Sequence, residues 1–174
     1  MAGVNIIPEK VVNYNVYLGN EKLVGVSADI TLPKLEPMTA TVSGAGIAGE
    51  YESPVPGHFG KLEMDMSFRS ISVDSAKLLV PGTKSLVLRA SQQSYDIAGG
   101  TTNYRQLKIT LKVMPKGVDL GKLSQGKPTE TKNTFEVIYI KVEENGLVLI
   151  ELDKLNFVYV VNGVDILAPI RNQI

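Results

Sequence analysis

Two Asn-Gly pairs in the last third of the chain constrain the fold more than any other feature of the sequence. Asn145-Gly146 separates two β-prone runs, 133–143 and 147–161, and Asn162-Gly163 ends the second run. Asn-Gly favours a type I′ turn, because both central residues of that turn need positive φ. In the first run apolar residues alternate with polar ones, as in a strand with two different faces. Residues 125–165 therefore predict paired antiparallel strands.

Alternating apolar and polar residues predict further strands elsewhere. They cover residues 11–18, 22–32, 59–69, 86–90, 95–97 and 104–114. One short helix is predicted at 72–80, where Ser72 or Asp74 can cap the first turn and Pro81-Gly82 ends it. Residues 166–170 could begin a further turn of helix, which Pro169 keeps short. The residues thus predict a mainly β protein whose short helix packs against a sheet.

The composition favours a single domain over residues 1–174. The 18 basic and 18 acidic residues cancel, which argues against tight, sequence-independent binding of nucleic acid. The chain has no cysteine, so a disulfide framework and thiolate metal sites are excluded. No apolar run is long enough to span a membrane, and the N-terminal MAGVNIIPEK does not resemble a secretory signal. We expect synthesis and folding in a cytosol, without membrane insertion.

Residues 38–60 differ in character from the rest of the chain. They contain five glycines and two prolines, and their apolar residues show only weak periodicity. We therefore expect a long loop here. A loop of this length is unusual in a compact domain, and such loops are usually functional or become ordered by a partner.

The motifs that resemble chemical sites are better explained without catalysis. Residues 44–49 (GAGIAG) match the G-x-G-x-x-G pattern, but the Pro-rich segment after them cannot form the helix that a dinucleotide site needs. His58 is the only histidine, which favours a surface or packing role. The pairs Glu50/Glu52 and Glu143/Glu144 lie in expected turns or loops, where solvated carboxylates are the ordinary state. We predict no catalytic residue, no cofactor and no metal site.

Several segments, taken in order, resemble the major tail tube proteins of contractile-tailed phages, the P2-like type, which have relatives in R-type bacteriocins. The resemblance is carried by residues 30–35 (ITLPKL), 44–49 (GAGIAG), 126–131, 147–153 and 161–165 (VNGVD). It implies an antiparallel β-sandwich or β-barrel with one flanking short α-helix. It also implies hexameric rings that stack into a tube inside a contractile sheath, where the inner sheets of neighbouring subunits join into a barrel around the lumen.

This resemblance implies partners as well. They are other copies of the chain, the surrounding sheath protein, and baseplate and tail-terminator proteins, with DNA possible in the lumen but not specifically bound. A neutral chain fits such a conduit, because a strongly basic wall would hold DNA. The residues before Val11 and the region 34–60 are the expected contacts between subunits. Within that region the candidates are Lys34, Leu35, Met38, Gly44, Gly46, Ile47, Gly49, Tyr51, Val55 and His58.

Three alternatives stay open. The first is the tube protein of a related contractile secretion system. The second is a monomeric β-barrel that binds a small ligand, which would require an enclosed apolar pocket. The third is an enzyme that uses Glu50 or Glu52. The sequence also leaves open whether the particle is a phage or a bacteriocin.

Overall fold

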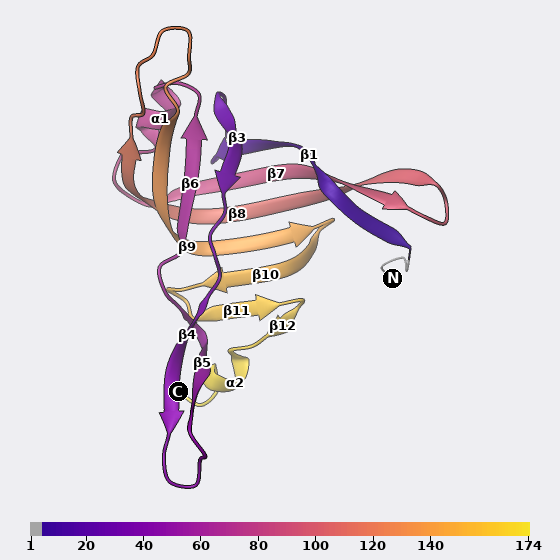
Figure 1. Cartoon of the computed structure of the whole chain (residues 1–174), viewed down its shortest axis with the longest axis vertical. Helices are drawn as coiled ribbons and strands as arrows, with labels where there is room; N and C mark the ends of the chain where they lie inside the picture. Colours follow the sequence, from indigo (N-terminus) through magenta and orange to yellow (C-terminus); the bar gives the residue numbers. More distant parts are fainter. Residues whose placement is uncertain (1–4) are drawn as a thin grey trace.

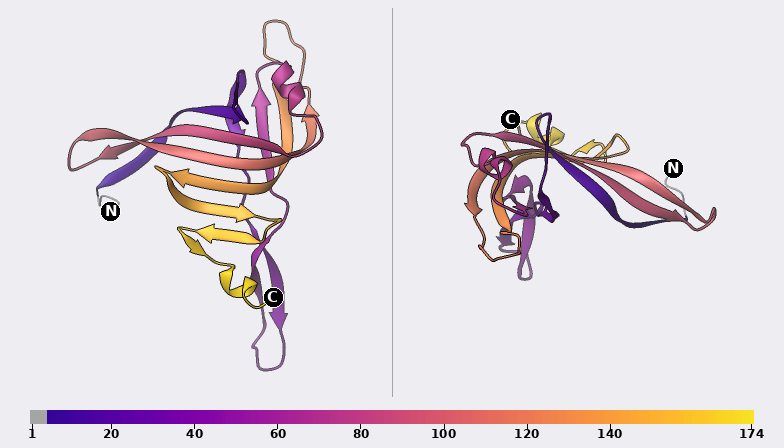
Figure 2. Two further views of the ribbon diagram at one scale, coloured as in Figure 1. Left: turned by 180° about the vertical axis from the view of Figure 1, so that it is seen from behind. Right: turned by 90° about the horizontal axis from the view of Figure 1, so that it is seen from above.

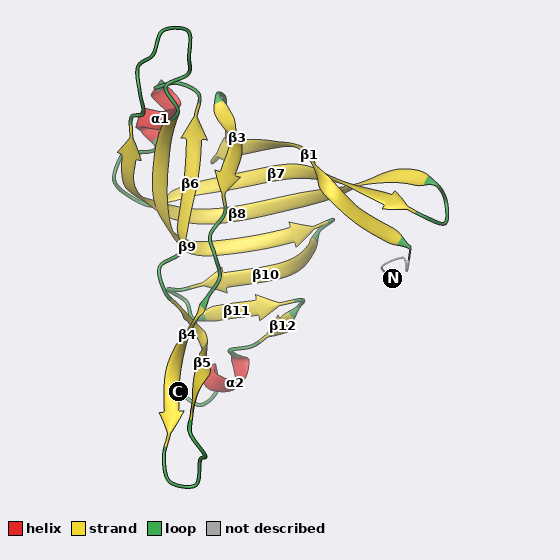
Figure 3. Cartoon of the chain, in the orientation of Figure 1, coloured by secondary structure: helices red, strands yellow, loops and turns green. Residues whose placement is uncertain are grey.

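Antiparallel strands and two short helices form the part of the chain that this computed structural model describes, residues 5–174 (Figures 1 and 3). The strands are β1 (Ile6–Leu18), β2 (Glu21–Leu23), β3 (Val26–Thr31), β4 (Pro37–Ser43), β5 (Glu50–Phe59), β6 (Glu63–Phe68), β7 (Lys84–Asp96), β8 (Thr101–Asp119), β9 (Thr131–Glu144), β10 (Leu147–Asp153), β11 (Val158–Val161) and β12 (Val164–Asp165). The helices are α1 (Val73–Lys77) and α2 (Ala168–Arg171). The predicted mainly β class is confirmed, with a second short helix beside the expected one. Neither helix is long and apolar enough to cross a membrane.

The main sheet has ten strands and divides at β9. Eight of them follow the order β12-β11-β10-β9-β8-β7-β1-β2. One edge of β9 pairs with β8, whereas the other edge pairs with β6 over its first half and with β10 over its second half. β3 pairs with β6, and β4 and β5 form a separate two-stranded sheet. Thus β9 belongs to two layers of the protein, one that continues into β6 and β3 and one that continues into β10, β11 and β12.

Bulges in the β8–β9 pairing bend the sheet over its own core. The register shifts between Lys112 and Val113 and again between Pro115 and Gly117. An extra residue in one strand bends that strand and increases its twist. Seen from above, β8 and β9 curve so that the β6 end of the sheet turns out of the plane of β7 and β10 (Figure 2).

The core lies between the two layers. In β6, the fully buried Met64, Met66 and Phe68 alternate with half-buried polar residues, as the sequence predicts. They form one core cluster with buried side chains of β7, β8, β9 and β10, which include Leu86, Leu111, Val113, Phe135 and Leu152. The predicted burial of Val137 and Ile140 is confirmed, since their exposed fractions are 0% and 4%.

The predicted hairpin at Asn145-Gly146 is present, and Asn162-Gly163 also joins two strands, β11 and β12, but the strand expected at 147–161 is broken. Asn145 and Gly146 have φ values of 47° and 83°, and they join β9 to β10. The expected single strand 147–161 instead ends at Asp153. Its carboxylate accepts the backbone N–H groups of Leu155 and Asn156, each at 3.0 Å, and so turns the chain before β11 begins. An Asx turn of this kind competes with continuation of the strand.

Other boundaries also differ from the predictions. β1 starts at Ile6 and includes Pro8, which an edge strand tolerates because no ladder bond needs its missing N–H. The expected strand 22–32 is split into β2 and β3, and Gly25 between them has φ of 86°. The expected strands 86–90 and 95–97 are both parts of β7. The expected strand 59–69 is shortened to β6, and α1 is shorter than predicted but has the predicted N-cap, Ser72.

The prediction of a long loop at 38–60 is wrong. Residues 37–59 form a β-hairpin in which Val42 pairs with Tyr51 and Ser43 with Glu50, so that only 44–49 form a loop. We call this hairpin, β4 with β5 and their turn, the arm. It extends beyond the main sheet at one end of the molecule's longest axis (Figure 1). Most of its residues are exposed on both faces, which explains why the sequence lacks the usual alternation.

Candidate assembly interface

The arm has two faces of different chemistry. Alternate positions of its paired strands place Thr39, Thr41, Glu50 and Glu52 on one face, where the Thr39 hydroxyl lies 3.4 Å from the Glu52 carboxylate. The other face carries Ala40, Val42, Tyr51 and Ser53. The Tyr51 side chain is 55% exposed. A two-stranded hairpin is marginal by itself, so an arm with an exposed apolar face gains stability when another surface covers that face.

The C-terminal segment fixes the root of the arm. Gly57 of β5 packs against Leu167, whose side chain is fully buried just before α2. Arg171 of α2 forms an ion pair with Asp165 and donates a hydrogen bond to the Phe157 carbonyl oxygen at 2.9 Å. These contacts hold α2 beside β5, as Figure 1 shows.

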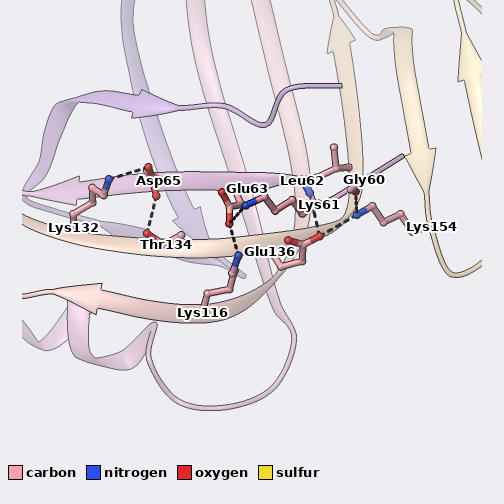
Figure 4. Close-up of polar contacts among 10 residues, drawn as sticks. All are labelled: Gly60, Lys61, Leu62, Glu63, Asp65, Lys116, Lys132, Thr134, Glu136 and Lys154. Atoms are coloured by element: carbon pink, nitrogen blue, oxygen red, sulfur yellow. Dashed lines mark hydrogen bonds and ion pairs between the residues drawn. The ribbon is translucent and has the colours of Figure 1, made fainter. Parts of the chain in front are cut away.

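Polar contacts of Lys154 and Glu136 hold the segment that follows the arm, residues 60–62 (Figure 4). The Lys154 ammonium donates to the Gly60 carbonyl oxygen at 2.7 Å and to the Glu136 carboxylate at 3.0 Å. The Leu62 backbone N–H donates to the same Glu136 oxygen at 3.1 Å. Partial burial acts to raise the pKa of Glu136, but the hydrogen bonds from Lys154 and Leu62 outweigh burial and lower it. The segment that leaves the arm is therefore held at the β9–β10 layer.

The remaining charges in Figure 4 form structural pairs across β6, β8 and β9. Asp65 accepts hydrogen bonds from Lys132 at 3.0 Å and from the Thr134 hydroxyl at 2.7 Å. Burial acts to raise the pKa of Asp65, and these two donors lower it below its ordinary value. Glu63 pairs with Lys116, whose hydrogen bond is the main cause of the lowered pKa of Glu63. Each carboxylate thus has a cationic partner that keeps it ionised.

A second projection consists of the outer parts of β1, β7 and β8, which we call the ribbon. Figure 2 shows it leaving the body as a twisted three-stranded extension. Its exposed apolar residues are Ile6, Ile7, Val11, Val12, Tyr95 and Tyr104. β1 pairs with β7 throughout but with β2 only from Val16 to Leu18, so within the described residues the outer edge of β1 is otherwise unpaired. Such an edge is a ready surface for pairing with another chain.

The structure gathers most of the predicted contact residues in the arm. Met38, Ile47 and Tyr51 are exposed there, and Gly44, Gly46 and Gly49 form its turn. Lys34 and Leu35 precede the arm; Lys34 pairs with Glu36, whereas Leu35 packs against the core. Val55 is half-buried, and the ring of the exposed His58 lies edge-to-face with the Phe157 ring, with 5.9 Å between centroids.

The candidate residues before Val11 lie in the ribbon, except for residues 1–4, which lie outside the described part of the chain. Sequence reasoning missed Tyr95, Ile97 and Tyr104 as exposed apolar residues. Their alternation resembles that of an ordinary core strand, and only the length of β7 and β8 beyond the body reveals their exposure.

The residues considered for chemistry have structural roles. Residues 44–49 are followed by strand β5 and not by the helix of a dinucleotide site. Glu143 pairs with Lys108 and Lys141, and Glu144 pairs with Arg105. Within residues 5–174, no group of three or more His, Asp or Glu side chains is placed to hold a metal ion. The arm and the ribbon, rather than a pocket, are the features that call for a functional explanation.

Comparisons with known proteins agree with this geometry. Residues 8–174 match the family described as phage tail tube protein FII. The tail tube protein of Escherichia phage P2 is 29% identical over 171 residues, which cover 97% of this chain and 98% of that protein. The major tail tube protein of Serratia phage KSP20 is 23% identical over 157 residues, which cover 90% of each chain. The chain belongs to the phage tail tube protein FII family, and it is a structural subunit of the tail tube of a phage virion rather than an enzyme.

Proposed function

We propose that six copies of this chain form a ring, and that rings stack into the inner tube of a contractile tail. The observation that carries the proposal is that the arm and the ribbon both leave the body with apolar side chains uncovered. A soluble monomer rarely keeps contiguous apolar patches exposed, whereas subunit contacts need them. In this proposal the whole chain acts as a single tube domain.

The subunit contacts that we propose use both projections. The arm supplies Met38, Ile47 and Tyr51, together with the turn glycines and the neighbouring Lys34, Leu35, Val55 and His58. The unpaired outer edge of β1 supports edge-to-edge joining of sheets, because a closed ring of sheets leaves no free edge. Pro8 and two register shifts, between Pro8 and Lys10 and between Val11 and Asn13, interrupt the ladder toward the tip of β1.

The outer surface of such a tube would contact a sheath protein, and its ends would contact baseplate and tail-terminator proteins. The balance of 18 basic and 18 acidic residues supports a lumen through which DNA slides without specific binding. The chain would be made in the bacterial host cytoplasm and function in the assembled tail.

The oligomeric state of the purified full chain tests this proposal. Light scattering after size exclusion should give rings with six times the mass of the 18.9-kDa chain, and negative-stain microscopy should show rings or tubes. A monomer at every concentration would contradict it. A monomer that also retains an apolar small molecule would instead support a ligand carrier. The site of such a ligand would be the groove of about 460 Å³ between β1 and β3, lined in part by Val11, Val12, Ile30 and Leu32.

A further inference from the structure

The two ends of the molecule's longest axis carry different side chains. The arm forms one end, and the loop of residues 120–130 between β8 and β9 forms the other, beside α1 (Figure 1). Three exposed cations gather at this second end: Lys122 and Lys127 in the loop, and Arg69 at the end of β6. We call these three residues the basic end. The loop contains one carboxylate, Glu130, and Asp119 directly precedes it, its carboxylate accepting the Gly121 N–H at 2.9 Å.

The arm is acidic, and its two carboxylates have no cationic partner within residues 5–174. Residues 37–59 contain Glu50 and Glu52 but no lysine or arginine. Within the described part of the chain, neither glutamate lies within ion-pair distance of a cation, and none of the three cations of the basic end lies within that distance of a carboxylate. Many other charges of the protein are paired. The two glutamates of the arm and the three cations of the basic end thus lie at opposite ends, and Glu130 is the exposed carboxylate among those cations.

Exposed apolar residues accompany the charges at both ends. Ile47 and Tyr51 are exposed on the arm, and Leu120 and Leu123 are exposed in the loop, where the exposed fraction of Leu123 reaches 89%. Each end therefore offers apolar as well as charged side chains; on the arm, Tyr51 lies on the face opposite to Glu50 and Glu52. Subunit interfaces combine these two kinds of contact, with apolar burial for affinity and charge for orientation.

The loop at the basic end is held in place at its base. The backbone N–H of Lys122 donates to the Thr129 carbonyl oxygen at 3.0 Å, and the N–H of Thr129 donates to the Arg69 carbonyl oxygen at 2.9 Å. These bonds tie the loop to the end of β6 and bring Arg69 near the lysines of the loop. A preorganised surface loses less entropy on binding than a free loop.

We propose that the arm of one copy seats on the basic end of the next copy, with Glu50 and Glu52 facing Lys122, Lys127 and Arg69. The two surfaces are different parts of the same chain, so the contact is heterologous and repeats with one polarity from copy to copy. The inference rests on the proposed function, because it states which surfaces join neighbouring subunits of the tube. Its partner is a second copy of this chain.

Two charge-reversed variants of the full chain test the pairing. Glu50→Lys/Glu52→Lys reverses the arm, and Lys122→Glu/Lys127→Glu reverses the lysines of the basic end. Alone, each variant should need about tenfold more protein, or still more, for half-maximal assembly, because like charges then face each other. Mixed in equal amounts, the two variants should assemble together in alternation. In the mixture, the positive arm of the first variant faces the negative end of the second variant. The unchanged negative arm of the second variant faces the unchanged basic end of the first.

Controls separate this inference from the proposed function. Arg89→Glu/Lys112→Glu changes the net charge as much as the basic-end variant does, but both residues are exposed on the face of the main sheet opposite to the core. This control should assemble like the unchanged protein, and circular dichroism should show that every variant is folded. Normal assembly of both reversed variants alone, or failure of the mixture while the control assembles, would overturn the arm-to-basic-end contact. Absence of assembly by the unchanged protein would instead overturn the proposed function.

Discussion

A Cβ atom at Gly57 would lie 2.5 Å from Cδ1 and Cδ2 of Leu167, so the arm and the C-terminal segment meet without room for one more carbon atom. Gly57 also has φ of 73°, a conformation that side chains rarely adopt. Two features therefore favour glycine at position 57: the left-handed backbone conformation and the close approach to the fully buried Leu167. This contact sets where the arm leaves the body.

We expect Gly57→Ala to destabilise the protein by about 1–3 kcal/mol, because the new methyl group clashes with Leu167 and strains the backbone. The measurement is the free energy of unfolding in denaturant. Gly60→Ala is the matched control, since Gly60 has no atom within 4 Å of its would-be Cβ and no positive φ. Equal stability of the two variants would show that the root of the arm is not closely packed.

Val137→Asp should destabilise the protein by several kcal/mol, about 3 or more, because it buries a carboxylate without a partner. Val137 is fully buried between the layers. Val24→Asp makes the same change at a valine that is 71% exposed, and it should change stability by less than about 0.5 kcal/mol. Thermal unfolding followed by circular dichroism compares the two. A small effect at position 137 would contradict the assigned core.

The pH dependence of stability should report the Glu136 contact at the root of the arm. The pKa of Glu136 is lowered in the folded protein, so the unfolded chain binds its proton more readily. The stabilisation is therefore present at neutral pH, and it is lost as pH falls below the ordinary glutamate value of 4.5 and through the folded pKa. Glu136→Gln should lower the melting temperature at pH 7 and reduce its fall in acid.

Glu130→Gln serves as the control for this pH experiment, because Glu130 is exposed and forms no ion pair within the described residues. Its melting curve should follow that of the unchanged protein across the pH range. If Glu136→Gln did the same, the carboxylate would contribute nothing measurable to the root of the arm.

Shortening the arm should separate folding from assembly. Thr39 and Pro54 are paired across the hairpin, so a short Gly-Ser linker can replace residues 40–53 while Gly57 and Leu167 keep their contact. The removed residues contribute no side chain to the buried core, and the unfolding free energy should change by less than about 1 kcal/mol. Negative-stain microscopy should show that tubes are lost or shortened. Tubes of undiminished length would exclude the arm from subunit contacts.

Local signals predicted the hairpin at Asn145-Gly146, the helix cap and the core strand β6. Asn145-Gly146 and Asn162-Gly163 readily adopt the positive φ that a tight turn needs, and Ser72 caps α1 through bonds to its own neighbours. Met64, Met66 and Phe68 alternate with polar residues because one face of β6 is buried. These features depend on residues close in sequence or on burial of one face, which leaves a visible pattern.

The sequence by itself therefore determined the β class, the turns and much of the core. Only the tertiary structure decided that residues 37–59 form a projecting hairpin, that the ribbon leaves the body and that Gly57 meets Leu167. A strand with both faces in solvent lacks the alternation of apolar and polar residues from which a strand is predicted. The surfaces proposed for assembly are of this kind, because an interface awaiting another copy keeps exposed what a core would bury.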